Sequence, residues 1–145
     1  MRDINLIVIH CTATESGVDY SAAQVRAWHK HRGFRDIGYH FLIHLNGDIE
    51  RGRPWDLPGA HAKGYNNTSV GICYVGGLIR GEPFDTRTVA QIHSLRAAVS
   101  MLKAQYPMIE VTGHRDLSVD LNGDGMISEQ EWMKACPCFD VKTDL

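Results

Sequence analysis

The sequence lacks three features that would each point to a specialised class of protein. It has no long apolar run, because the longest one near the N-terminus, Leu6–Ile9, is far shorter than the ~20 residues of a membrane span. It has no excess of one charge, since 15 basic and 17 acidic residues leave a net charge of −2 and no basic run stands out. It has no internal repeat or low-complexity segment. These absences argue against a membrane span, a nucleic-acid-binding groove and a disordered chain.

The first residues also lack the pattern of a secretory signal. Met1–Asn5 do not show a basic segment followed by an apolar one, and no small-residue cleavage site follows them. We therefore expect no signal peptide, and a chain that stays in the cytoplasm until it is released or exported. The length of 145 residues, with no linker, predicts a single domain over 1–145.

What the sequence does contain is four cysteines and eight histidines. The cysteines are Cys11, Cys73, Cys136 and Cys138, an even number that is also compatible with disulfides. A chain of this length can build a core without disulfides, so we interpret them as thiols that are either buried or bound to a metal. Eight histidines are too many for all of them to be functional, so we use their positions in the sequence to distinguish candidate site residues from structural or surface ones.

The hydrophobic pattern alternates between strands and helices. Short β-branched runs predict strands, and the Asn46-Gly47 pair predicts a hairpin. Two capping boxes, Ser21–Gln24 and Thr88–Gln91, each begin a run with helical spacing. The expected strands cover 4–9, 38–44, 48–51, 70–75 and 109–112, and a short helical piece is expected near 129–135. This order predicts an α/β fold with a mixed central β-sheet flanked by helices.

Two histidines, His10 and His114, stand at the ends of predicted strands, where side chains of neighbouring strands meet at one rim of a sheet. Cys136 lies beside Pro137, which stiffens the backbone. Two imidazoles and one thiolate form a ligand set of catalytic zinc, with water in the fourth position. Taken alone, however, these residues favour a simpler interpretation, in which the histidines are hydrogen-bonded structural residues and Cys136 is a small buried hydrophobe.

Seven segments of the chain follow one another in a recognisable order. They are Val8–Thr14, Val25–His29, Ile37–Phe41, His61–Asn66, Val70–Cys73, Gly113–Asp116 and Lys134–Asp140. Together they resemble the type 2 N-acetylmuramoyl-L-alanine amidases, the zinc family of phage lysozyme-like amidases and peptidoglycan recognition proteins. The resemblance extends from about Ile4 to Asp140. Each segment alone is a modest signal, but seven in order are highly specific.

This resemblance implies a single α/β domain with a zinc site in a surface cleft. It assigns His10, His114 and Cys136 as the zinc ligands, and favours Cys136 over Cys138 because the family ligand precedes the proline. The implied activity is zinc-dependent hydrolysis of the amide between N-acetylmuramic acid and L-alanine, in lysis or turnover of the cell wall. We therefore expect peptidoglycan or a muropeptide as the partner of a monomeric enzyme.

The same resemblance implies roles for three further residues. Tyr39 is expected to direct its hydroxyl at the zinc-bound water or the developing oxyanion, and Lys134 to place an ammonium beside the same charge. His61 is expected at the cleft wall, in contact with the substrate. No His-Glu-x-x-His motif supplies a general base, so the proton acceptor stays open between a lysine beside the zinc and the metal hydroxide.

Residues 120–131 carry a second metal pattern, because they match the calcium-loop template at every constrained position. The predicted calcium ligands are Asp120, Asn122, Asp124, Met126 and Glu131. A polar turn that hydrogen-bonds to itself also explains the segment, and no helix is predicted before it. The segment is not part of the minimal family pattern, so we interpret it as an insertion. Calcium there would fix His114 relative to Cys136.

Two other functions are compatible with the resemblance. One is a recognition module of the same fold that binds muropeptides without cutting them; such members lack ligand residues, whereas here the expected ligands and Tyr39 are all present. The other is a protein-binding regulator, since some phage amidases of the family also inhibit an RNA polymerase. Nothing in the sequence tests the second alternative.

Overall fold

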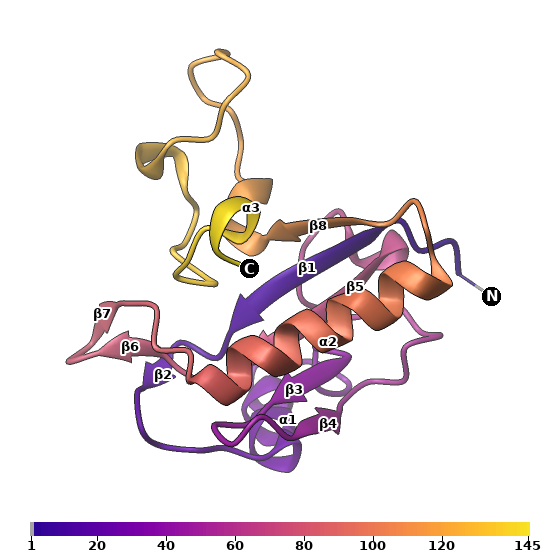
Figure 1. Ribbon diagram of the computed structural model, residues 1–145, viewed down its shortest axis with the longest axis vertical. Helices are drawn as coiled ribbons and strands as arrows, with labels where there is room; N and C mark the ends of the chain where they lie inside the picture. The colour runs from indigo at the N-terminus through magenta and orange to yellow at the C-terminus, as the bar shows by residue number, and fades with distance from the viewer. Residues whose placement is uncertain (1) are drawn as a thin grey trace.

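The protein is built around a five-stranded mixed sheet, as a computed structural model that describes residues 2–145 shows (Figure 1). The strand order is β4-β3-β5-β1-β8, in which only β4 runs antiparallel to its neighbour. The strands are β1 (Leu6–Cys11), β3 (Phe41–Ile43), β4 (Ile49–Arg51), β5 (Ser69–Tyr74) and β8 (Glu110–Gly113). The predicted α/β fold with a mixed sheet is confirmed.

The two central strands are buried on both faces. Every residue of β5 is buried, and so are the last five residues of β1. Their parallel pairing sets Ile9 beside Ile72 and His10 beside Cys73. A strand covered on both sides needs a nearly continuous apolar run, which explains why both strands were recognisable from sequence.

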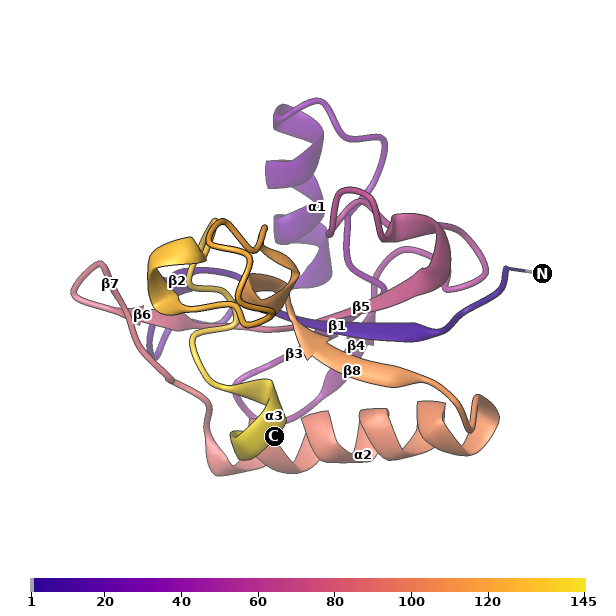
Figure 2. The same cartoon turned by 90° about the horizontal axis from the view of Figure 1, so that it is seen from above.

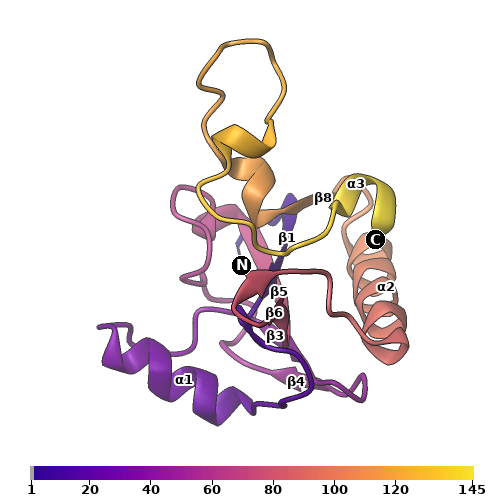
Figure 3. The same cartoon turned by 90° about the vertical axis from the view of Figure 1, so that its left-hand side faces the viewer.

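Two helices cover opposite faces of this sheet (Figures 2 and 3). α2 (Val89–Gln105) packs Leu95, Val99 and Leu102 against the larger core, which includes Ile7 and Ile72. α1 (Ala22–His31) closes the other face. There its buried side joins a smaller core of Ala22, Val25, Ile37, Leu42, Cys73 and Val75.

Both helices begin at the predicted capping boxes. The side chains of Ser21 and Thr88 each accept a hydrogen bond from the backbone N–H three residues later, and the glutamine there bonds back to the cap. None of the helices in the described residues is long and apolar enough to cross a membrane.

Smaller elements complete the fold. A three-stranded sheet of order β2-β6-β7 extends beyond the end of β1. Its strands are β2 (Thr14–Glu15), β6 (Gly77–Ile79) and β7 (Glu82–Pro83), while α3 (Val141–Asp144) ends the chain and η1 (Asn66–Thr68) precedes β5.

The segment after β8 differs from the rest because it projects away from the sheet (Figures 1 and 3). It contains two short turns of 3-10 helix, η2 (His114–Leu117) and η3 (Glu129–Glu131). The helical piece expected over 129–135 is therefore only one turn long. The reason is that the N–H of Met133 donates to the Ser118 hydroxyl at 2.9 Å instead of continuing a helix.

Candidate metal centre and cleft

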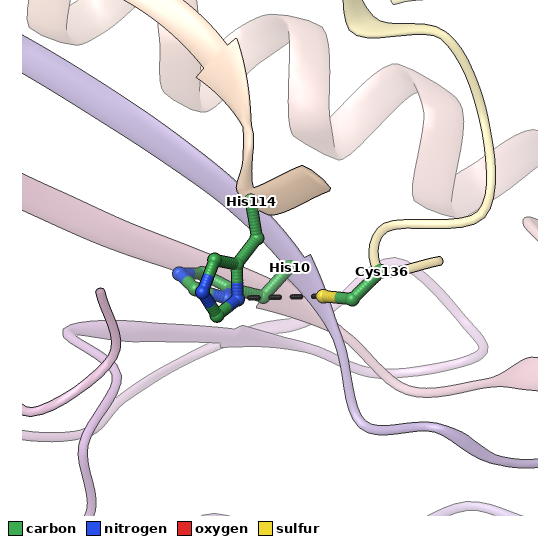
Figure 4. Close-up of side chains that lie close together, drawn as sticks. All are labelled: His10, His114 and Cys136. Atoms are coloured by element: carbon green, nitrogen blue, oxygen red, sulfur yellow. Dashed lines mark hydrogen bonds between the residues drawn. The ribbon is translucent and has the colours of Figure 1, made fainter. Parts of the chain in front are cut away.

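Parallel pairing of β1 with β8 brings the two strand-end histidines together. Ile9 is paired with Gly113, so His10, next to last in β1, and His114, directly after β8, lie at the same edge of the sheet. Cys136 reaches this edge from the returning arm of the projecting segment (Figure 4). Two ligand candidates are thus carried by the sheet and its edge, and the third is carried by a loop.

The donor atoms of these three residues lie close together. One nitrogen of each histidine and the Cys136 sulfur all lie within 4.8 Å of one another. The sulfur is 3.8 Å from His10 Nδ1, and the three residues are only 1%, 7% and 8% exposed. His114 Nδ1 is buried, and no group within residues 2–145 forms a hydrogen bond with it. Because an unpaired buried nitrogen is costly, its position fits a metal ligand better than a structural residue.

Burial keeps the imidazoles of the site neutral. It holds the pKa of His10 far below its ordinary value, with further contributions from His61 and His114. It lowers the pKa of His114 to about 4, helped by the nearby charge of Lys134. A neutral imidazole presents a free lone pair, so both rings are in the protonation state that binds a metal.

His61 lies directly behind His10. Its Nδ1 is 2.8 Å from His10 Nε2, and its Nε2 is 3.3 Å from the Ser69 hydroxyl. Burial lowers the pKa of His61 to about 3, so the ring is neutral. With His10 Nε2–H donating to His61 Nδ1, the opposite nitrogen of His10 is left free to face Cys136.

The space for the His61 ring comes from glycine. A Cβ atom on Gly71, in the middle of β5, would lie 2.7 Å from the ring. A Cβ atom on Gly59 would lie 2.5 Å from it. Asn66 holds the His61 backbone, since its side-chain oxygen accepts from the N–H groups of His61 and Ala62. Sequence reasoning did not foresee this packing.

Tyr39 enters the site from the residues before β3. Its ring centroid is 5.1 Å from that of His10. Burial raises the pKa of its hydroxyl well above the ordinary value, with the thiol of Cys73 adding to the effect. The hydroxyl therefore keeps its proton and is available as a hydrogen-bond donor.

All six residues predicted for the zinc site and its surroundings line one cleft of about 480 Å³. They are His10, Tyr39, His61, His114, Lys134 and Cys136. Lys134 is exposed, unlike the metal-binding candidates. The sequence reasoning missed other lining residues, among them Arg32, Phe34, Lys63 and Tyr65. These residues come from a turn and a loop, where no strand or helix pattern indicates which way a side chain faces.

Comparison with known proteins agrees with this geometry. The family model Amidase_2, N-acetylmuramoyl-L-alanine amidase, matches residues 1–138. The endolysin of Klebsiella phage KP32 is 39% identical over 142 residues, which cover 97% of this chain and 85% of that protein. The chain belongs to the N-acetylmuramoyl-L-alanine amidase family.

Solved structures show the same fold. The N-acetylmuramoyl-L-alanine amidase LysC from Clostridium intestinale has a TM-score of 0.73 and 28% identity, covering 96% of this chain and 79% of that one. Bumblebee PGRP-SA has a TM-score of 0.69 and 27% identity, covering 90% and 81%. The family match and the endolysin relatives identify the chain as an amidase.

The projecting loop of the amidase brings the three acidic residues among the predicted calcium ligands together. Carboxylate oxygens of Asp120, Asp124 and Glu131 lie within 4.8 Å of one another. Yet both Asp120 oxygens accept backbone N–H groups of Gly123 and Gly125. The loop thus satisfies its own polar groups, as the alternative interpretation expected. Nothing in the comparisons supports calcium, and the site at Asp120, Asn122, Asp124, Met126 and Glu131 stays a prediction.

Proposed function

We propose that this amidase uses zinc to hydrolyse the amide between N-acetylmuramic acid and L-alanine in peptidoglycan. The observation that carries the proposal is the convergence of His10, His114 and Cys136 in the wall of the cleft. Two neutral imidazoles and one thiol match a ligand set that leaves the fourth zinc position for water or substrate. The unpaired Nδ1 of His114 supports the same conclusion.

When bound, zinc would polarise the substrate carbonyl and lower the pKa of a water molecule to ~7. The chain's own residues would then stabilise the charge that attack creates. Tyr39 would donate a hydrogen bond to the developing oxyanion; this role is supported by its ring centroid 5.1 Å from that of His10 and by the raised pKa that keeps its hydroxyl protonated. Lys134 adds a positive charge close enough to depress the pKa of both histidine ligands.

We further propose that His61 is a positioning residue for His10. Its 2.8 Å hydrogen bond to His10 Nε2 supports this role, because such a bond fixes both the tautomer and the orientation of a metal ligand. His61 also lines the cleft, so its predicted contact with substrate stays open to test.

The proposal is tested by digesting purified peptidoglycan and identifying the products by mass spectrometry. We expect free stem peptides that begin at L-alanine, their loss when a chelator removes the metal, and their return when zinc is added. Stem peptides that remain attached to muramic acid would contradict the proposal. Binding to muropeptides without any product would instead support a recognition module. The structural similarity to PGRP-SA is compatible with that alternative.

A further inference from the structure

A second pair of sulfur atoms lies beside the metal centre and has no part in the proposed mechanism. The thiols of Cys11 and Cys138 are 3.8 Å apart, although the two residues are separated by 127 positions in the chain. Cys11 is buried at the end of β1, and Cys138 is half-buried in the returning arm after η3. This contact therefore joins the central sheet to the projecting segment.

Both side chains are directed into this contact by their surroundings. Cys138 adopts a φ of 69°, in the left-handed region that few residues other than glycine, asparagine and aspartate occupy. A backbone held there indicates a local constraint. Cys11 is confined on its other side by Gly77, where a Cβ atom would lie 2.6 Å from the Cys11 sulfur.

We propose that Cys11 and Cys138 form an oxidisable pair that closes to a disulfide, and that Cys136 is left free to bind the metal. The two sulfurs need to approach by less than 2 Å to reach the length of an S–S bond, ~2.05 Å. The sparing of Cys136 rests on the proposed function, because a sulfur bound to zinc is not available for exchange. The backbone N–H of Cys11 already donates to the Cys136 sulfur at 3.2 Å.

The oxidant is a small-molecule disulfide of the glutathione type, and the reaction is thiol–disulfide exchange. Cys138, the more accessible sulfur, attacks the oxidant as a thiolate and releases one small thiol, which leaves a mixed disulfide. Cys11 then attacks the Cys138 sulfur and releases the second small thiol. Two protein S–H bonds and one S–S bond of the oxidant are lost, and one protein S–S bond and two small thiols are formed.

The disulfide would stabilise the joint between the two parts of the site. Closing a loop of this length removes much of the entropy of the unfolded chain, and we expect the Tm to rise by about 10 °C. A wall-degrading enzyme acts outside the cytoplasm, where disulfides persist. The link would thus form where the enzyme works.

The experiment uses the zinc-loaded protein with reduced or oxidised glutathione. Because Cys11 is buried and Cys138 only half-buried, exchange with a small disulfide is slow, and the reaction is followed over hours at pH 8. Peptide mapping without reduction should show a link between Cys11 and Cys138, with zinc retained and a Tm increase that dithiothreitol reverses. The Cys138→Ser variant should show neither the link nor the increase. Cys73→Ala, which removes a buried thiol outside the pair, should keep the link.

Two results would overturn the proposal. One is free thiols at both positions after oxidation. The other is a link that includes Cys136 and expels zinc. A Cys11–Cys138 link in a protein that releases no stem peptide would leave the disulfide standing and refute only the proposed function.

Discussion

The two halves of the candidate metal centre are held in different ways. His10 lies within a buried central strand, with His61 packed behind it against β5. Cys136 and Lys134 instead lie on a segment whose backbone is secured mostly by side chains. There Ser118 accepts from the N–H of Met133, and the Glu131 carboxylate accepts backbone N–H groups of the same segment.

This difference shows how a buried strand and an irregular segment can share one site. The strand-borne half is fixed by the same burial that stabilises the fold, so its geometry exists before a metal binds. The loop-borne half joins the sheet around Cys136, where the Cys11 N–H donates to the Cys136 sulfur at 3.2 Å and the Tyr74 hydroxyl donates to the Pro137 carbonyl at 2.6 Å. We therefore expect substitutions in the two halves to have different consequences.

The largest expected effect comes from the loop-borne ligand. Cys136→Ser should lower amidase activity about a thousandfold, because the metal supplies several kcal/mol of transition-state stabilisation. Zinc content after dialysis and the rate of stem-peptide release measure the effect. Cys138→Ser, two residues away, is the matched control and should retain zinc. Full zinc occupancy in Cys136→Ser would refute its assignment as a ligand.

Loss of the Tyr39 hydroxyl should act on the chemical step alone. Tyr39→Phe is expected to lower kcat about a hundredfold, the size typical of one oxyanion donor, while zinc affinity stays unchanged. The kinetics are compared with a zinc competition assay on the same preparation. A variant that loses zinc, or one that keeps wild-type kcat, would contradict the proposed role.

His61→Gln tests whether the hydrogen bond with His61 holds His10 in the orientation that binds zinc. Zinc affinity should fall about 10–100-fold, the usual cost of removing a partner of a metal-binding histidine. Cobalt substitution gives an independent readout, because the visible spectrum reports the geometry of the ligands. An increase in KM with an unchanged spectrum and affinity would favour the predicted substrate contact instead.

Lys134→Gln should have a smaller effect, because the ammonium is exposed and its field is weakened by water. We expect a loss of about tenfold in kcat/KM, corresponding to about 1.4 kcal/mol. The loss should shrink as salt is added. A drop as large as that of Tyr39→Phe, independent of salt, would show that Lys134 transfers a proton.

The smallest effect on activity is expected from Glu131→Gln, which loosens the projecting loop. Hydrogen bonds, first that of the Ser128 N–H, hold the pKa of the Glu131 carboxyl below its ordinary value. Its stabilising contribution is therefore complete above about pH 4.5 and is lost as the pH falls through the lowered pKa. At pH 7 the variant should show faster proteolysis within 118–135 than wild type, and wild type should show the same acceleration in acid.

The same proteolysis experiment, repeated with and without calcium, tests the prediction that residues 120–131 bind calcium. Protection of wild type but not of Glu131→Gln by calcium would establish the site. Identical digestion with and without calcium in both proteins would remove it.

From the sequence, the strand pattern alone predicted the part of the site that lies at the ends of strands. His10 and His114 were identifiable because each follows an apolar run, and parallel strands end at the same edge. Cys136 needed the family resemblance, since a loop has no period from which its position follows. The contact between His61 and His10 could not be predicted, because the His61 ring lies in space left by Gly59 and Gly71. A glycine in a sequence does not indicate which side chain fills the space beside it.

Gly71 has a consequence for anyone who diversifies this enzyme. It occupies the middle of a strand in which every residue is buried, and even the Cβ of alanine there would lie 2.7 Å from the ring of His61, the hydrogen-bond partner of His10. In a library that randomises this strand to raise stability, variants that replace Gly71 could fold well and still be inactive, because the new side chain would displace the His61 ring. Conversely, a methyl group placed there offers a way to disable the enzyme without changing any polar atom.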